Sequence, residues 1–291
     1  LFHLGAMSAI RLKNDLQIYY LRKVAQGKNK MSVLNAVRNK IIHLISWVAN
    51  VPTTQILPST DIKLDLNVDS IDFMLFIVKM EKLFNINNKN ILVTGASSGI
   101  GRACSILLSQ LGANIFLVGR SKSRLAETYE MLLGDNHQIF EFDLLEVDKI
   151  KFFVKDNFSV IKFHSIVNCA GVSPTSPYLF STPKKLQSTL SLNVMAPYEL
   201  TRTVIKHASN SEMSIVFIAS VMGMVGEKAK SMYSLSKGAL IALTKSLAIE
   251  LADKNIRVNA ISPAVVDTPL IKNSEYYKSK EGMNKILEKH P

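Results

Sequence analysis

From residue 90 onward, short runs of apolar residues alternate with longer segments whose apolar positions recur at helical spacing. The runs at residues 90–93, 113–118 and 215–218 are almost unbroken, which is typical of parallel strands buried on both faces. Residues 102–111 follow the first run and have a helical pattern. This alternation predicts an α/β fold, a Rossmann-type doubly wound parallel sheet.

The first 88 residues have a different pattern. Residues 1–46 indicate two basic helices around a glycine, and residues 47–88 contain an apolar helix that begins near Ser70. We therefore expect an N-terminal all-helical appendage and boundaries at 1–46, 47–88 and 89–291. Charge follows this division, because the three segments carry +7, −2 and +7 of the net +12.

Composition limits the class of protein. A chain of 291 residues that is 47% hydrophobic can bury one large core and a small appendage. Cys104 and Cys169 lack metal-ligand spacing and predict buried thiols in a reducing cytoplasm. No apolar run reaches membrane-spanning length and no signal-peptide pattern is present, so we expect a cytoplasmic protein without a membrane partner.

A glycine-rich run joins the first strand to the first helix of the α/β part. A strand, a glycine-rich turn and a helix form the context of a dinucleotide-binding turn. Glycines let the backbone approach a pyrophosphate, and free N–H groups at the helix start attract its charge. We therefore predict cofactor contacts from the residues of this turn: Gly95, Ser97, Ser98, Gly99, Ile100 and Gly101.

The end of the second strand bears on the choice of cofactor. An acidic residue there would hold the ribose 2′-hydroxyl of NAD, whereas an arginine accommodates the 2′-phosphate of NADP. Arg120 occupies this point, with Lys122 and Arg124 nearby, and Arg102 can join them from the first helix. These residues favour NADPH. The alternative is that they are ordinary surface charges at the start of a helix.

Tyr233 and Lys237 lie four residues apart, on one face of a predicted helix. Reduction of a ketone by hydride transfer leaves an alkoxide, which Tyr233 can protonate. A cationic Lys237 would lower the phenol pKa from its ordinary value toward working pH. Ser220 ends an apolar strand, where its hydroxyl can polarise the substrate carbonyl. The alternative is an amphipathic helix with a solvated lysine.

Together these residues, in this order over 89–291, resemble the classical short-chain dehydrogenase/reductase family, most closely its 3-oxoacyl-[acyl-carrier-protein] reductases. The resemblance implies a catalytic tetrad of Asn193, Ser220, Tyr233 and Lys237. Asn193 would anchor a water that relays protons to Lys237, and Lys237 would also bind the nicotinamide ribose. The remaining cofactor contacts that the resemblance implies are Asp143, Leu144, Asn168, Ala170, Gly171, Pro263, Val266 and Thr268, with Tyr233.

Family members usually continue further beyond a segment like residues 262–268 than this chain does. We therefore expect the reductase domain to be incomplete at its C-terminus, without the last strand and much of a common dimer interface. The resemblance implies a homo-oligomer, and the missing interface argues against one.

Residues 66–74 resemble the Asp-Ser-Leu segment and second helix of acyl carrier proteins. The resemblance implies a 4′-phosphopantetheine arm on Ser70, at a helix N-terminus whose dipole favours a phosphodiester. The alternative is that Asp69 or Ser70 only caps the helix. The third and fourth carrier helices should follow Ile86, but a reductase strand follows instead, so the segment is a partial carrier domain.

Residues 1–46 resemble the C-terminal end of a bacterial insertion-sequence transposase, without a catalytic residue that can be carried over. Their basic charge fits nucleic acid or a solvated helical face, and we favour the solvated face. An alternative start at Met31 would make residues 33–48 the first carrier helix.

These observations predict NADPH-dependent reduction of a 3-oxoacyl thioester on acyl carrier protein, in fatty-acid or polyketide synthesis. Two alternatives stay open. One is a short-chain dehydrogenase acting on another alcohol or ketone, and the other is a non-functional fusion fragment.

Overall fold

The computed structural model describes residues 86–266 and 268–272, together with Ala25. The predictions for residues 1–46 and 47–88 therefore lie almost wholly outside the described residues, and so does Ser70. The contacts within the chain separate two units, Leu1–Asn87 and Asn88–Pro291, and the fold described below belongs to the second.

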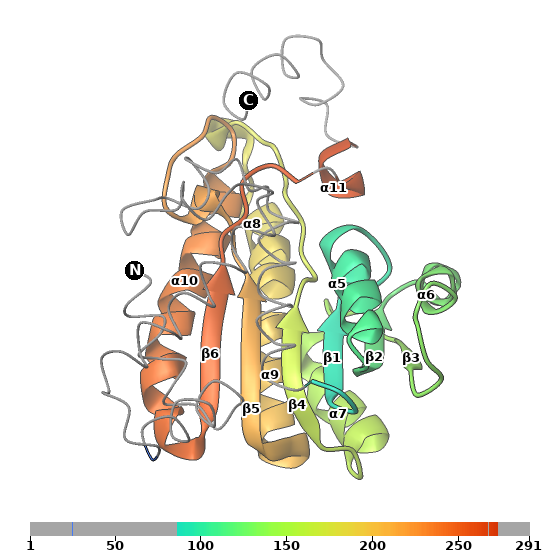
Figure 1. Ribbon diagram of the computed structural model, residues 1–291. Helices are drawn as coiled ribbons and strands as arrows, with labels where there is room; N and C mark the ends of the chain where they lie inside the picture. The colour runs from blue at the N-terminus through green and yellow to red at the C-terminus, as the bar shows by residue number, and fades with distance from the viewer. Residues whose placement is uncertain (1–24, 26–85, 267, 273–291) are drawn as a thin grey trace. The chain divides into compact units, whose positions relative to one another are not determined.

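Six parallel strands form one sheet in the order β3-β2-β1-β4-β5-β6 (Figure 1). The strands are β1 (Asn90–Thr94), β2 (Asn114–Gly119), β3 (Gln138–Glu141), β4 (Phe163–Asn168), β5 (Ser209–Ile218) and β6 (Ile256–Ile261). The predicted Rossmann-type doubly wound parallel sheet is thus confirmed. β5 begins at Ser209, earlier than the apolar run at 215–218. The sequence pattern did not indicate this start, because the first residues of the strand are polar.

Helices connect successive strands, and a further helix follows β6. They are α5 (Gly99–Gln110), α6 (Lys122–Tyr129), α7 (Ile150–Phe158), α8 (Pro183–Leu190), α9 (Ala196–Ala208), α10 (Ser231–Glu250) and α11 (Pro269–Lys272). Short 3-10 turns are η2 (Val147–Lys149), η3 (Tyr178–Phe180), η5 (Val221–Gly223) and η6 (Ala252–Lys254), and η4 (Ser191–Met195) is a π-helical turn. No described helix has the length and apolarity needed to cross a membrane.

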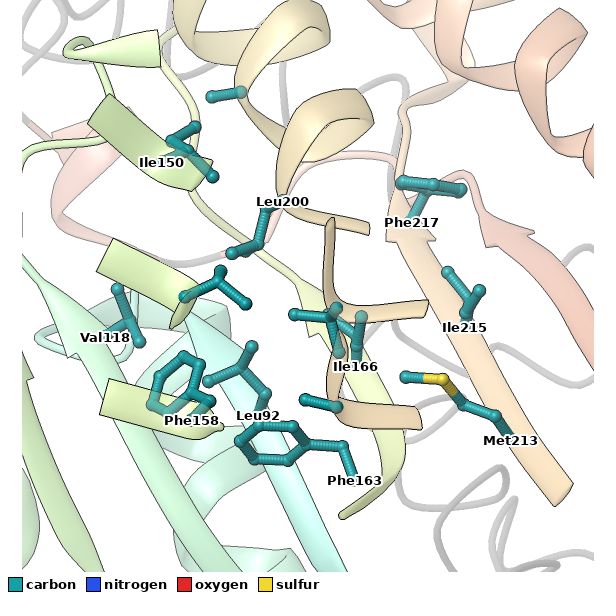
Figure 2. Close-up of a cluster of buried hydrophobic side chains, with 14 of the residues drawn as sticks. Leu92, Val118, Ile150, Phe158, Phe163, Ile166, Leu200, Met213, Ile215 and Phe217 are labelled. Carbon is teal, nitrogen blue, oxygen red and sulfur yellow. The ribbon is translucent and has the colours of Figure 1, made fainter. Parts of the chain in front are cut away.

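Successive residues of each strand point to opposite faces of the sheet. Leu92 and Val118 pack with side chains of α7 and α9 in one large cluster (Figure 2). Leu240 of α10 belongs to the same cluster, whereas Ile91 and Val93 are buried outside it. Burial on both faces explains why the strands are nearly continuous apolar runs.

The strand order reverses at β1, which pairs with β2 on one side and β4 on the other. Ligands of open α/β sheets bind at the carboxyl ends of the strands at such a switch point. The pairing aligns Thr94 with Asn168, and the Thr94 hydroxyl oxygen accepts the N–H groups of Cys169 and Ala170 at 3.1 and 3.2 Å. This edge of the sheet therefore carries the glycine-rich turn and the chain that follows β4.

Candidate active site

The glycine-rich turn approaches the end of β4 so closely that side chains are excluded from it. Gly95 has φ of 63°, and a Cβ there would lie 2.8 Å from the backbone nitrogen of Ala170. A Cβ at Gly101 would collide with the carbonyl oxygen of Gly95. Gly99 also has positive φ, of 53°. The turn therefore exposes bare backbone at the switch point, as close approach of a pyrophosphate requires.

The first turn of α5 suits an anion. Ser98 precedes the helix with extended backbone, its side chain makes no capping hydrogen bond, and the first turn contains no acidic residue. The Ser98 side chain therefore does not cap the first N–H groups of the helix. Next to the turn, the buried Oδ1 of Asn168 has no hydrogen-bond partner among the described residues, although its amide nitrogen donates to Thr201 Oγ1 at 3.3 Å. An uncapped helix start, excluded side chains and a buried unpaired acceptor together fit a bound dinucleotide.

The segment after β6 returns to the glycine-rich turn. A Cβ at Gly99 would lie 3.2 Å from the methyl group of Thr268, and Thr268 and Val266 are both buried. The carbonyl oxygen of Pro263 accepts the N–H of Val221 at 3.0 Å. This segment therefore spans from the end of β5 to the start of α5, across the carboxyl edge of the sheet.

The described residues include every member of the predicted basic pocket edge. Arg120 is exposed immediately after β2, at the carboxyl edge of the sheet. The Arg102 guanidinium donates to the Ser97 carbonyl and to Glu127, both at 2.8 Å, and to the Arg124 carbonyl at 3.3 Å. Arg102 therefore borders Arg124 with its charge paired to Glu127, and its part in cofactor binding stays a prediction.

Asp143 and Leu144 lie just beyond β3. The N–H of Phe142 donates to the carbonyl oxygen of Gly119 at 2.8 Å, so this loop follows the end of β2. Asp143 Oδ1 accepts the N–H of Leu145 at 3.0 Å, and Leu144 is buried. One oxygen of the Asp143 carboxylate is therefore used locally and the other is available to a ligand.

The two cysteines lie close to the turn. Cys104 of α5 is buried, whereas Cys169 is only half-buried, in contrast to the expectation that both are buried. A hydrogen bond between the two thiols and burial both raise the pKa of Cys104 above its ordinary value. Among the described residues, no group of histidine, cysteine, aspartate and glutamate side chains could hold a metal ion.

Ser220 and Tyr233 meet beyond the end of β5. Ser220 is buried, and its hydroxyl oxygen accepts the N–H of Met222 at 3.2 Å. Burial raises the pKa of Tyr233 above its ordinary value, and a hydrogen bond between the Tyr233 and Ser220 side chains opposes this rise. The phenol is therefore protonated at neutral pH and is in hydrogen-bond contact with a serine hydroxyl.

Lys237 is buried one helical turn after Tyr233, with 6% of its surface exposed. Its Nζ donates to the carbonyl oxygen of Ile218 at 2.6 Å and lies 5.7 Å from the centroid of the Tyr233 ring. Burial lowers the pKa of Lys237 to about 8. The expectation that Lys237 lowers the pKa of Tyr233 is wrong for this structure, because desolvation dominates the tyrosine and the ammonium is bound to Ile218.

Asn193 lies in the π-helical turn η4, where α8 passes into α9. Its Oδ1 accepts the N–H of Val172 at 2.8 Å, and its Nδ2 donates to the Val172 carbonyl and to Ser236 Oγ, both at 2.9 Å. A Cβ at Gly171 would lie 3.1 Å from Asn193 Oδ1 and 3.6 Å from Lys237 Nζ. Gly171 therefore separates Asn193 from Lys237, and the π turn holds the amide in place.

The structure thus brings Asn193, Ser220, Tyr233 and Lys237 together at the carboxyl edge of the sheet. Three polar residues that support this edge were missed in the sequence: Thr94, Ser236 and Lys230. Ser236 and Lys230 both lie within one helical turn of Tyr233, and this spacing is the only signal that could have identified them.

Comparison with known proteins agrees with this geometry. Residues 89–278 match the family model for short chain dehydrogenases. The chain belongs to the short-chain dehydrogenase/reductase family and is an oxidoreductase of that family that uses a nicotinamide cofactor.

Two relatives illustrate the range within the family. The chain is 33% identical over 180 residues to carbonyl reductase family member 4 of Danio rerio, covering 62% of this chain and 76% of that protein. It is 31% identical over 206 residues to 3-oxoacyl-[acyl-carrier-protein] reductase FabG of Buchnera aphidicola, covering 69% of this chain and 83% of that protein.

Solved structures with the same fold include dehydrogenases named for other substrates. A protein described as an NAD(P)-dependent gluconate 5-dehydrogenase from Beutenbergia cavernae, with bound NADP, superposes with a TM-score of 0.64 and 26% identity, covering 70% of this chain and 82% of that one. A 4-hydroxyisoleucine dehydrogenase complexed with NADH superposes with a TM-score of 0.61 and 31% identity, covering 69% and 82%.

Proposed function

We propose that this protein reduces the ketone of a 3-oxoacyl thioester with NADPH. The observation that carries the proposal is the contact between the protonated Tyr233 phenol and the Ser220 hydroxyl, one helical turn from the buried Lys237 amine. These three groups lie at the same sheet edge as the glycine-rich turn, so a ketone held by them would be close to a bound dinucleotide.

In this proposal, each residue of the tetrad has one role. Reduced nicotinamide, when bound, supplies the hydride that adds to the ketone carbon. Ser220 donates a hydrogen bond to the carbonyl oxygen, and Tyr233 transfers its phenolic proton to that oxygen as the alkoxide forms. Lys237, with a pKa of about 8, can then return a proton to the phenolate, and Asn193 holds the surrounding backbone.

The dinucleotide would be held by backbone as much as by side chains. Around the pyrophosphate and nicotinamide we assign the predicted contacts Gly95, Ser97, Ser98, Gly99, Ile100, Gly101, Pro263, Val266 and Thr268. Around the ribose and adenine we assign Arg120, Asp143, Leu144, Asn168, Ala170 and Gly171, with Tyr233 and Lys237. Arg120 supports NADPH, because an exposed guanidinium at the end of β2 matches a 2′-phosphate and no carboxylate takes that place in the sequence.

The substrate class is supported by the surroundings of the tetrad. Tyr178, Leu179 and Phe180 of η3 are largely exposed, as are Met224 and Val225 after η5. The two loops are joined where Ser176 N–H donates to the carbonyl oxygen of Ala229 at 2.8 Å. Exposed apolar side chains on the chain segments that follow β4 and β5 suit an acyl chain, and two of the similar proteins are named 3-oxoacyl-[acyl-carrier-protein] reductases. The partner would then be acyl carrier protein, in cytoplasmic fatty-acid or polyketide synthesis.

The test is oxidation of NADPH by the full chain with a 3-oxoacyl thioester on acyl carrier protein, compared with the same acyl group on a pantetheine arm. We expect turnover with both, faster with the carrier, and slower turnover when NADH replaces NADPH. A folded chain that reduces simple ketones but neither thioester would overturn the proposed substrate.

A second candidate is oxidation of a hydroxy acid. It is favoured by Lys230, a cation near Tyr233, and by the similarity to a gluconate dehydrogenase and a 4-hydroxyisoleucine dehydrogenase. Reduction of NADP by a 3-hydroxy acid, without turnover of thioesters, would establish this alternative.

A further inference from the structure

Lys230 is a half-buried cation beside the tetrad that the mechanism above does not use. It immediately precedes α10, and its Nζ lies 5.8 Å from the centroid of the Tyr233 ring. Burial lowers the pKa of Lys230 below its ordinary value, and the nearby Glu227 opposes this shift. A cation therefore lies 5.8 Å from the centre of the Tyr233 ring, at a cost in solvation.

The direct hydrogen bonds of Lys230 do not pair its charge, and Glu227 acts on it only at longer range. Nζ donates to Thr175 Oγ1 at 2.8 Å, to Ser173 Oγ at 3.1 Å and to the Ser173 carbonyl at 3.4 Å. All three acceptors are neutral, and within the described part of the chain no carboxylate forms an ion pair with Lys230. Neutral hydrogen bonds between two loops do not require an ammonium, and a partly desolvated one is costly without a charged or strongly accepting partner.

The position of Lys230 points to the substrate as that partner. Ser173 and Thr175 lie in the chain after β4, and Lys230 ends the loop after η5. These two loops flank Tyr233, and the hydrogen bond from Ser176 N–H to the Ala229 carbonyl holds them together. A ketone in contact with Tyr233 would therefore place its neighbouring atoms near Lys230.

We propose that Lys230 binds a second oxygen acceptor of the substrate, separated from the reacting ketone by one carbon. This rests on the proposed function, which places the ketone at Tyr233. In a 3-oxoacyl thioester the acceptor is the thioester carbonyl, and in a 3-oxo acid it is a carboxylate oxygen. A simple ketone has no such group, so Lys230 determines specificity for 1,3-dicarbonyl substrates.

The experiment compares three substrates of similar size: a 3-oxoacyl thioester, the 3-oxo acid and the corresponding simple ketone. The wild-type chain is measured beside Lys230→Met, Lys230→Arg and the control Lys228→Met, which removes an exposed lysine of the same loop. We expect Lys230→Met to lower kcat/KM for the two dicarbonyl substrates by about ten- to a hundredfold and to change the ketone less than about twofold. Lys230→Arg should retain most of the preference, and Lys228→Met all of it.

The outcomes separate this inference from the proposed function. If wild type reduces the thioester but Lys230→Met keeps the preference, or loses activity on all three substrates equally, Lys230 is a loop contact and the inference is wrong. If wild type prefers only the 3-oxo acid and Lys230→Met abolishes that preference, the thioester function is wrong and the Lys230 inference holds.

Binding provides a second measurement that does not depend on turnover. With NADPH present, which cannot react with an alcohol, the 3-hydroxy acid and the corresponding simple alcohol are titrated against wild type and Lys230→Met. Tighter binding of the acid to wild type alone supports the inference, and equal binding to both proteins overturns it. Matching thermal unfolding of the two proteins shows that the variant is folded.

Discussion

The Lys237 ammonium donates a hydrogen bond to the carbonyl oxygen of Ile218 at 2.6 Å. Ile218 is the last residue of β5, two positions before Ser220, and Lys237 is one helical turn after Tyr233. A single bond therefore ties the helix that carries the proposed acid to the strand that carries the proposed carbonyl donor. The precision of the tetrad depends on this junction between β5 and α10.

Replacing Tyr233 by phenylalanine removes the proposed proton donor and keeps the ring. We expect kcat for NADPH oxidation with a 3-oxoacyl thioester to fall by about a hundred- to ten-thousandfold, because the alkoxide is left without a positioned acid. The affinity for NADPH, measured by fluorescence titration, should fall much less than kcat, because Tyr233 is one of many assigned cofactor contacts. Activity that survives the substitution would show that another group protonates the product.

Replacing Lys237 by methionine should change how stability depends on pH. The pKa of Lys237 is about 8 in the folded chain and 10.5 ordinarily. Between these values the unfolded chain binds more protons at this position, so the contribution of Lys237 to the free energy of unfolding rises with pH, by at most about 1.4 kcal/mol per unit. It is smallest below pH 8.

Urea unfolding from about pH 8 to about pH 10 measures this effect as the difference between wild type and Lys237→Met. Tyr233, whose raised pKa lowers stability as pH increases above 10, is present in both proteins and does not enter the difference below that pH. The difference should grow with pH in favour of wild type. A constant difference would mean that Lys237 is not desolvated as the structure shows.

Gly95→Ala places a methyl group 2.8 Å from the backbone nitrogen of Ala170, at a residue with φ of 63°. The new methyl group and the Ala170 nitrogen can separate only if the backbone at the end of β1 or β4 moves. We therefore expect the free energy of unfolding to fall by about 1 to 3 kcal/mol. Gly226→Ala is the matched control, because a Cβ there meets nothing within 4 Å. Equal stability of the two variants would contradict the close approach of the turn to β4.

Arg120→Asp should reverse the preference between the two nicotinamide cofactors. The guanidinium is replaced by a carboxylate that repels a 2′-phosphate and can accept from a ribose hydroxyl. We expect KM for NADPH to rise by about ten- to a hundredfold and KM for NADH to fall. Lys162→Asp, at the opposite edge of the sheet just before β4, controls for the change in net charge. A parallel loss of both cofactors in Arg120→Asp would argue against a 2′-phosphate site.

Much of the site was predictable from local sequence because its parts are short and contiguous. The glycine-rich turn was recognised from its position between an apolar run and a helix, and Tyr233 and Lys237 from their helical spacing. The amide contacts of Asn193 were not predictable. Its partners Val172 and Ser236 are 21 and 43 residues away, and the π turn that aims the amide has no sequence signal.

The electrostatic predictions from the sequence also fail where a group depends on residues distant in the chain. Lys237 was expected to lower the pKa of Tyr233 on the basis of spacing alone, yet burial of the phenol has the larger effect. The charge of Arg102 is paired by Glu127, 25 residues away in the chain, and no local pattern indicates this partner. Burial and distant partners depend on how the elements pack, and neither is encoded in a short motif.

The α/β class, the doubly wound sheet and the candidates for the reactive side chains follow from the sequence alone, because hydrophobic periodicity and residue spacing are local properties. The packed fold is needed to establish which charges are paired, which polar groups are desolvated and that Lys230 lies near the Tyr233 ring. These depend on the loops after β4 and β5 meeting at one edge of the sheet, and such a contact between distant segments exists only once the chain has folded.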